Sequence, residues 1–168
     1  MRQRSYGAVD VHYPPDGGAR AALVVAAGES FGPPLSEHTV WLDEVAAYQP
    51  GLFYLRELPA VRAVVAVAAT PLEVLVVDGY VDLDPHGRPG LGRYVHDALG
   101  TAVVGVAKTS FQSATHAVAV QRGGSTRPVY VTAAGLPVAR AAALVSAMVG
   151  PHRLPDALRR VDRLARTG

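Results

Sequence analysis

Three acidic side chains lie at positions where an acid is unusual. Asp10 interrupts the apolar run GAVDV, Asp78 follows the apolar run EVLVV, and Glu57 follows Arg56 within the segment GLFYLRELPA. Strands disfavour Asp unless something binds it, and sites in open α/β sheets assemble at the carboxyl ends of strands. Three converging carboxylates without cysteine would provide oxygen ligands for Mg²⁺ or Mn²⁺. The chemistry of such a site is in-line attack on a phosphodiester.

A single lysine stands among the sixteen basic residues of the chain. Lys108 ends the apolar run TAVVGVAK, and every other basic residue is arginine. Lysine and arginine are not interchangeable where a compact point charge is needed, although chance alone can leave one lysine in a chain. At the end of a strand beside the carboxylates, Lys108 could neutralise charge on a phosphate or orient water.

Each of these residues also has an ordinary structural interpretation. Asp78 precedes Gly79 and could begin a turn, and Asp10 could be a partly exposed strand residue. Arg56 and Glu57 could be a solvated pair on a helix, which contributes little to stability. Their joint placement, together with the lone lysine, favours the metal-site interpretation.

The apolar patterns predict the elements that would position these side chains. Two strands joined by the turn PPDGG indicate an antiparallel hairpin, and alternating strands and helices further on indicate parallel pairing. We therefore predict an α/β fold with a mixed sheet, antiparallel first and parallel later. The predicted elements are the hairpin strands YGAVDVHY and ARAALVVAAG, a weaker strand HTVWL, a helix from about Phe53 to Ala69, strands EVLVVDG and TAVVGVAK around a helix GRYVHDALG, a strand pair HAVAVQR and RPVYVTA, and two closing helices at about Pro137 to Val149 and Leu154 to Arg166.

Composition limits the class of protein. The 168 residues suit one domain, residues 1–168, and zero cysteines exclude a disulfide framework, a thiol nucleophile and a cysteine-ligated zinc. No apolar run is long enough to span a membrane and the N-terminus lacks a signal-peptide core, so we expect a cytoplasmic protein without a membrane partner, with a monomer favoured. A net charge of +2 permits nucleic acid as a partner without requiring it. The arginines of the last helix could follow phosphates or could simply face solvent.

Six segments, taken in order, resemble the endonuclease V family. They are GAVDVHY, AYQPGLFYLRE, VVDGY, GLGRYVHDAL, GVAKT and HRLPDALRR, and together they extend over nearly the whole chain. The resemblance implies a ribonuclease-H-like fold and cleavage of DNA or RNA near deoxyinosine or inosine with Mg²⁺ or Mn²⁺. It makes Asp10, Glu57 and Asp78 the metal-binding carboxylates and Lys108 the catalytic-site lysine.

The resemblance also implies substrate contacts. The Tyr-Gln-Pro-Gly turn would insert as a wedge where a base has left the stack, which offsets the cost of unstacking. Glycines would let the backbone approach the flipped hypoxanthine. An ordinary surface-turn tyrosine is the alternative for Tyr48. The implied positions are Tyr48, Gln49 and Pro50 for the wedge, Gly51, Gly79 and Gly92 for the base, and His86 in a loop where the family often carries histidine.

The chain departs from the family pattern at two places. A Gly-His segment followed by Asp is expected after the late strand, but TAAGLPVARAAAL places Ala134 and Ala139 there, so a fourth catalytic position is expected to be lost. The loop YVDLDPHGRPG is longer than usual and carries Asp82 and Asp84. Acids beside a phosphate site would repel substrate unless they bind metal.

Three functions follow from these residues. The first is a metal-dependent endonuclease acting on inosine-containing nucleic acid. The second is a nucleic-acid-binding relative that has lost turnover, as Ala134 and Ala139 suggest. The third is a nuclease with a changed substrate, such as a structured RNA, as the altered loop suggests. We favour the first, because a binding protein has little reason to keep three carboxylates and Lys108 together.

Overall fold

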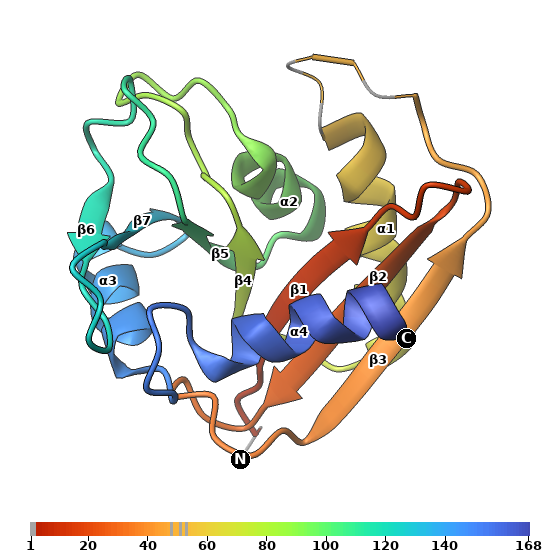
Figure 1. The fold of residues 1–168 in the computed structure, drawn as a ribbon, viewed down its shortest axis with the longest axis horizontal. Coiled ribbons are helices and arrows are strands. Elements are labelled where there is room, and N and C mark those ends of the chain that lie inside the picture. Colours follow the sequence, from red (N-terminus) through yellow and green to blue (C-terminus); the bar gives the residue numbers. More distant parts are fainter. Residues whose placement is uncertain (1–2, 48, 51, 53) are drawn as a thin grey trace.

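One seven-stranded sheet forms the centre of the protein (Figure 1). The computed structural model describes residues 3–47, 49, 50, 52 and 54–168. The strands lie in the order β3-β2-β1-β4-β5-β7-β6, so β4 is central and the first strand lies beside it. Their bounds are β1 (Tyr6–His12), β2 (Ala19–Ala26), β3 (Ser36–Leu42), β4 (Val74–Asp78), β5 (Ala102–Ala107), β6 (Val118–Val120) and β7 (Val129–Ala134).

The predicted hairpin and the predicted parallel pairing are both confirmed. β1 pairs antiparallel with β2, with Asp10 opposite Ala22, and parallel with β4, with Val9 beside Val77. β4 in turn pairs parallel with β5. The later strands are parallel only here, because β7 runs antiparallel to both β5 and β6. The sheet is therefore parallel at its centre and antiparallel on both sides.

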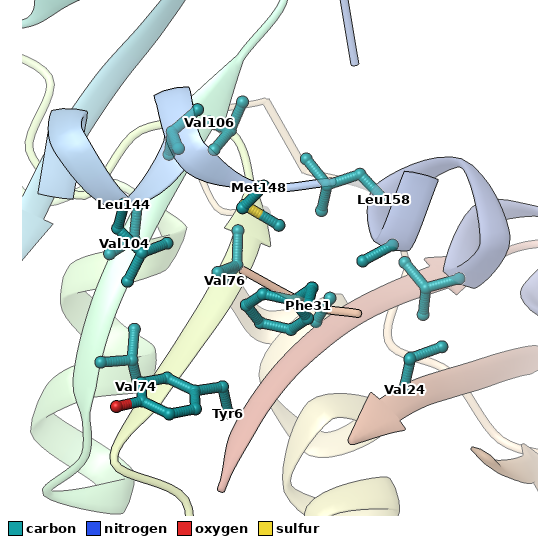
Figure 2. Packing of buried hydrophobic residues seen from close by; sticks show 14 of the residues in the cluster. Tyr6, Val24, Phe31, Val74, Val76, Val104, Val106, Leu144, Met148 and Leu158 are labelled. Atoms are coloured by element: carbon teal, nitrogen blue, oxygen red, sulfur yellow. The ribbon is translucent and has the colours of Figure 1, made fainter. Parts of the chain in front are cut away.

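In the part of the chain that the structure describes, four helices cover the two faces of this sheet. They are α1 (Tyr54–Ala68), α2 (Leu91–Leu99), α3 (Val138–Ala147) and α4 (Asp156–Thr167). Val61 of α1 and Val95 of α2 share one apolar cluster with Leu75 and Val77 of β4, while α3 and α4 belong to the cluster on the other face. Figure 2 shows side chains of this second cluster, including Leu158 of α4. Within the described residues, no helix is both long and apolar enough to cross a membrane.

The closing helix α4 is fixed across the first strands of the sheet (Figure 1). Its residues Leu158, Val161 and Ala165 are buried, as the helical period of an amphipathic helix requires. Arg20 of β2 donates to the carbonyls of Ala165 and Arg166 at 3.4 and 3.3 Å, which satisfies acceptors at the helix C-terminus. The polar face of α4 is thereby held in a defined orientation.

A buried arginine holds the end of α3. The side chain of Arg122 is only 6% exposed, and its Nη1 donates to the carbonyls of Val145 and Met148 at 2.8 and 2.9 Å. Its Nη2 donates to the carbonyl of Gly150 at 3.2 Å. These carbonyls lie at and beyond the end of the helix, where helical N–H donors run out. Arg122 therefore fixes the chain between α3 and α4.

Candidate active site

Asp10 and Asp78 meet at the carboxyl ends of the two central parallel strands. Because Val9 lies beside Val77 in the register, the next residue along each strand is one of these acids. Side chains alternate along a strand, and Ala8 and Val76 lie in the cluster under α3 and α4. Asp10 and Asp78 therefore belong to the face that α4 covers.

Glu57 reaches the same place from the opposite face of the sheet. It lies in the first turn of α1, and a small cavity of about 10 Å³ is lined by Asp10, Glu57 and Asp78 together. This volume is comparable to the space that a single water-sized species occupies. The neighbouring Arg56 does not pair with solvent alone, because its guanidinium lies 4.0 Å from the centre of the Tyr13 ring. Arg56 thus contacts an aromatic ring, while Glu57 lines the acidic cavity.

Two acids of this cavity, Asp10 and Glu57, hold protons more tightly than usual. Burial raises the pKa of Asp10 to about 7, with further increases from the charges of Asp78 and Asp162. Burial likewise raises the pKa of Glu57 to about 7, with added repulsion from Asp10 and Asp78. Desolvation and like charges both disfavour the ionised carboxylate. A cation at this cavity would relieve both effects.

Lys108 lies at this edge as well. It follows β5, and its Nζ is 3.6 Å from Oδ2 of Asp78, with both side chains 49% exposed. An exposed pair at this distance adds little stability, so its value lies in placing a positive charge beside the acids. Both charges remain accessible to a ligand from solvent.

The structure adds a fourth acid that the sequence did not indicate. Asp162 of α4 lines a cavity of about 450 Å³ with Asp10, Asp78 and Lys108, and its carboxyl group contributes to the raised pKa of Asp10. A signal was present in the sequence, because Asp162 is four residues from Leu158 and adjoins Val161, so it flanks the buried face of an amphipathic helix. From the sequence we considered only the arginines of this helix as possible ligand-binding residues.

The expectation of a lost catalytic position at Ala134 and Ala139 is wrong. In the antiparallel register of β5 and β7, Ala134 lies beside Val103, at the amino end of β5, whereas Lys108 follows the other end. Ala134 is 3% exposed and packs in the core between the sheet, α1 and α2. Ala139 lies in the first turn of α3, the helix that follows this end of β7. Neither position can reach the carboxylates, so their identity says nothing about catalysis.

The predicted wedge is described in part. Gln49 and Pro50 are exposed, and the backbone N–H of Leu52 donates to the carbonyl of Gln49 at 2.9 Å, which closes a turn. Tyr48 and Gly51, the other residues predicted to contact the base in this turn, lie outside the described residues. The described part of the turn thus presents side chains to solvent next to the helix that carries Glu57.

The remaining glycines differ in their surroundings. Gly79 follows Asp78 with φ +115°, and a Cβ placed on it meets no described atom within 4 Å. A Cβ on Gly92 would lie 2.7 Å from Cγ2 and 2.9 Å from Cα of Val81. Gly92 is therefore required for packing of α2, while the space beside Gly79 is open to a ligand.

The acids of the loop after β4 are used within the loop. Arg93 donates to both carboxylate oxygens of Asp82, at 3.0 and 2.9 Å. Asp84 accepts from the backbone N–H groups of His86 and Arg88, at 2.8 and 3.2 Å, and these bonds lower its pKa. The charge of Asp82 is thus neutralised and Asp84 organises a turn, while the His86 side chain is exposed. These contacts satisfy both acids within the loop, so neither Asp82 nor Asp84 has to bind a metal ion for a phosphate to lie nearby.

The carboxyl groups that line the small cavity are those of Asp10, Glu57 and Asp78, and they do not yet have the arrangement of metal ligands. Among the residues that the structure describes, no three His, Cys, Asp or Glu side chains are gathered closely enough to hold a metal ion as they stand. Ligation would require the carboxylates to turn toward the small cavity between them. The donor chemistry suits Mg²⁺ or Mn²⁺, since all the candidate ligands are oxygens.

A mixed sheet that gathers acids at the carboxyl ends of its central parallel strands defines a nuclease of the ribonuclease-H-like class. The endonuclease V family model matches residues 2–132. Endonuclease V of Azotobacter vinelandii is 30% identical over 94% of this chain and 80% of its own length. The protein belongs to the endonuclease V family, and it is an endonuclease.

Solved structures agree with this assignment. The structure of Streptomyces avermitilis endonuclease V has a TM-score of 0.81 and 26% identity, covering 96% of this chain and 79% of that one. A variant of Ciona intestinalis endonuclease V was solved with a 23mer DNA containing an inosine followed by a ribo-adenosine. It has a TM-score of 0.83 and 16% identity, covering 97% of this chain and 84% of that one. At that identity the Ciona structure supports the fold alone.

Proposed function

We propose that this protein is a metal-dependent endonuclease that hydrolyses a phosphodiester bond near deoxyinosine or inosine in nucleic acid. The observation that carries the proposal is the convergence of Asp10, Glu57 and Asp78 on one cavity, with Lys108 beside them. Burial and like charges raise the pKa values of Asp10 and Glu57, and a bound cation would relieve both effects. Membership of the endonuclease V family supports the choice of substrate, since a member of that family from Ciona intestinalis was solved with DNA that contains an inosine.

Asp10, Glu57 and Asp78 would hold Mg²⁺ or Mn²⁺, with Asp162 completing the acidic ring. The metal would supply Lewis-acid stabilisation of the phosphate charge that develops during in-line attack. Asp162 would add a further negative charge beside Asp10 and so favour a cation at the site. Lys108 would place its ammonium against a phosphate oxygen, in exchange for part of its contact with Asp78.

Substrate selection would come from the segments next to this site. The gap that the flipped base leaves in the stack would be filled by a wedge made of Tyr48, Gln49 and Pro50. The flipped base itself would be approached by the backbone at Gly51 and Gly79. An open side of Gly79 and the exposure of Gln49 and Pro50 support this role. We also propose that the protein is cytoplasmic and monomeric.

The test is strand cleavage of end-labelled oligonucleotides. DNA and RNA strands, each with and without one inosine, are incubated with the protein in Mg²⁺ or Mn²⁺, beside the variant Asp78→Asn. We expect inosine-dependent cutting that needs the metal and is lost in the variant. EDTA serves as the metal-free control.

Other outcomes separate the alternatives. Retained cutting by Asp78→Asn would contradict the proposed site. Cutting that is indifferent to inosine would identify a nuclease with a changed substrate. Binding without cutting, at high protein and metal concentrations, would identify a relative that has lost turnover.

A further inference from the structure

The large cavity at the acidic site has a basic wall. The cavity of about 450 Å³ is lined on the sheet side by Asp10, Asp78 and Lys108, and on the helix side by Arg159 and Arg163 of α4. Arg166 and Thr167 extend this wall toward the end of the helix. Acids that suit a cation and guanidinium groups that suit an anion therefore share one cavity.

The four arginines of α4 divide into three kinds. Arg160 points away from the cavity and donates to both carboxylate oxygens of Glu37 on β3, at 2.7 and 2.9 Å. Arg166 donates to Asp162, one helical turn away, at 3.0 Å. Arg159 and Arg163 form no ion pair with any residue that the structure describes. Two cationic side chains in the cavity are thus available to a ligand.

The spacing of these two residues suits an extended anion. Arg159 and Arg163 are four residues apart, so they lie on one face of the helix, about 6 Å apart along its axis. Asp162, which contacts Asp10, lies between them in sequence on the same face. A guanidinium presents a fork of donors that matches the oxygens of a phosphate, and arginine stays charged at any physiological pH.

We propose that Arg159 and Arg163 form a phosphate-binding wall that holds backbone phosphates next to the scissile one. This inference rests on the proposed function, and it assigns the path of the strand along α4. Lys108 already contacts Asp78, so it serves the reacting phosphate, whereas the two arginines serve its neighbours. Contacts to phosphates position a strand without reading its bases, so the wall acts on inosine-containing and ordinary strands alike.

Loss of a phosphate contact and loss of a purely structural role should affect KM and kcat differently. Its contacts are formed with the bound strand before and during cleavage, so their loss weakens substrate binding more than it slows the chemical step. We expect Arg159→Gln and Arg163→Gln each to raise KM by between about threefold and about tenfold, with kcat changed by less than about twofold. Both side chains are exposed, so folding should not depend on them.

The experiment measures binding against salt. Fluorescence anisotropy of labelled single strands, with and without inosine, is followed from about 50 mM to about 300 mM salt, in EDTA so that no cutting occurs. Wild type is compared with Arg159→Gln, Arg163→Gln and the double variant. Arg160→Gln is the matched control, because it removes the same charge from the same helix on the side that faces Glu37.

Each lost phosphate contact should reduce the slope of log affinity against log salt by about 0.7 on a single strand. We expect the double variant to lose about 1.4 in slope on both kinds of strand, and Arg160→Gln to lose almost nothing. Equal slopes for the double variant and Arg160→Gln would overturn the wall, while cleavage by wild type would leave the proposed function intact. A wild-type protein that binds with the expected slopes but never cuts would confirm the wall and contradict the endonuclease. No binding at low salt would overturn both.

Discussion

Asp162 of the last helix and Asp10 of the first strand line one cavity, although 151 residues separate them in the sequence. Burial is the main cause that raises the pKa of Asp10 to about 7, and the neighbouring carboxyl group of Asp162 raises it further. The pair therefore joins the position of α4 to the charge of the candidate site.

Replacing Asp162 should weaken the enzyme without unfolding it. In Asp162→Asn the shape is kept but one negative charge is lost beside Asp10. Residues that orient a metal ligand typically contribute between about tenfold and about a hundredfold, so we expect this loss in cleavage rate at limiting Mg²⁺. Asp97→Asn, an exposed acid on α2, is the control. Equal rates for the two variants would remove Asp162 from the site.

The metal-free protein should become more stable when Asp10 is neutralised. Because the pKa of Asp10 is about 7 when folded and 3.8 ordinarily, folding favours the protonated acid. The stabilisation from this proton is complete below about pH 4 and is lost as the pH rises through about 7. We expect Asp10→Asn in EDTA to increase the free energy of unfolding at pH 8 by about 1 to 3 kcal/mol, and the gain to vanish near pH 4. Urea unfolding at both pH values measures this, and a less stable variant at pH 8 would contradict the cause given for the pKa.

Cleavage should rise with pH through about 7 and should depend on metal concentration. Asp10 and Glu57 each have a pKa of about 7, and protons compete with a cation for the same oxygens. At low Mg²⁺ we expect the rate to reach half its maximum near pH 7, and at high Mg²⁺ at a lower pH. Rate profiles at several Mg²⁺ concentrations test this. A midpoint that does not move would show that other groups control the profile.

Loss of the buried guanidinium of Arg122 should destabilise the protein strongly. In Arg122→Met the carbonyls of Met148 and Gly150 lose the guanidinium as their donor, and that of Val145 keeps only the backbone N–H of Met148. Buried acceptors without partners are costly, so we expect a loss of about 2 to 4 kcal/mol in the free energy of unfolding. Arg127→Met, at an exposed arginine, is the control and should change stability by less than about 0.5 kcal/mol. A small effect at Arg122 would mean that water replaces the guanidinium.

Alanine at Gly92 and at Gly79 should affect different properties. At Gly92 the new Cβ collides with Val81, so we expect a loss of about 1 to 3 kcal/mol in the free energy of unfolding. At Gly79 no described atom obstructs the Cβ, and only the positive φ adds strain. We expect Gly79→Ala to remain folded and to lose preference for inosine over adenosine. Thermal unfolding and paired cleavage assays separate the two, and an unchanged preference would exclude Gly79 from the base site.

Local patterns were sufficient to predict the strands and helices. The turn PPDGG between two apolar runs indicated the β1 and β2 hairpin, and the apolar runs before Asp78 and Lys108 indicated adjacent buried strands. The side-by-side placement of Asp10 and Asp78 follows from parallel pairing, which the alternation of strands and helices favours. These features depend on short stretches of chain and on general rules of topology.

Long-range register could not be predicted in the same way. Ala134 was expected at the site because it follows a late strand, but β7 is antiparallel, and so its end lies at the opposite edge of the sheet. Asp162 was missed because the direction in which α4 crosses β1 depends on packing by Leu158 and Val161, which no local pattern encodes. The close approach of Gly92 to Val81 is likewise a tertiary contact.

The position of α4 at the end of the fold has a consequence during protein synthesis. Asp10 is added to the growing chain about 150 residues before Asp162, which at 5–20 residues per second is an interval of roughly eight to thirty seconds. Throughout that interval the nascent chain has neither the fourth acid nor the arginines of α4. The ribosome must therefore release α4 before the acids can come together, so the complete cavity forms only after synthesis of the last helix.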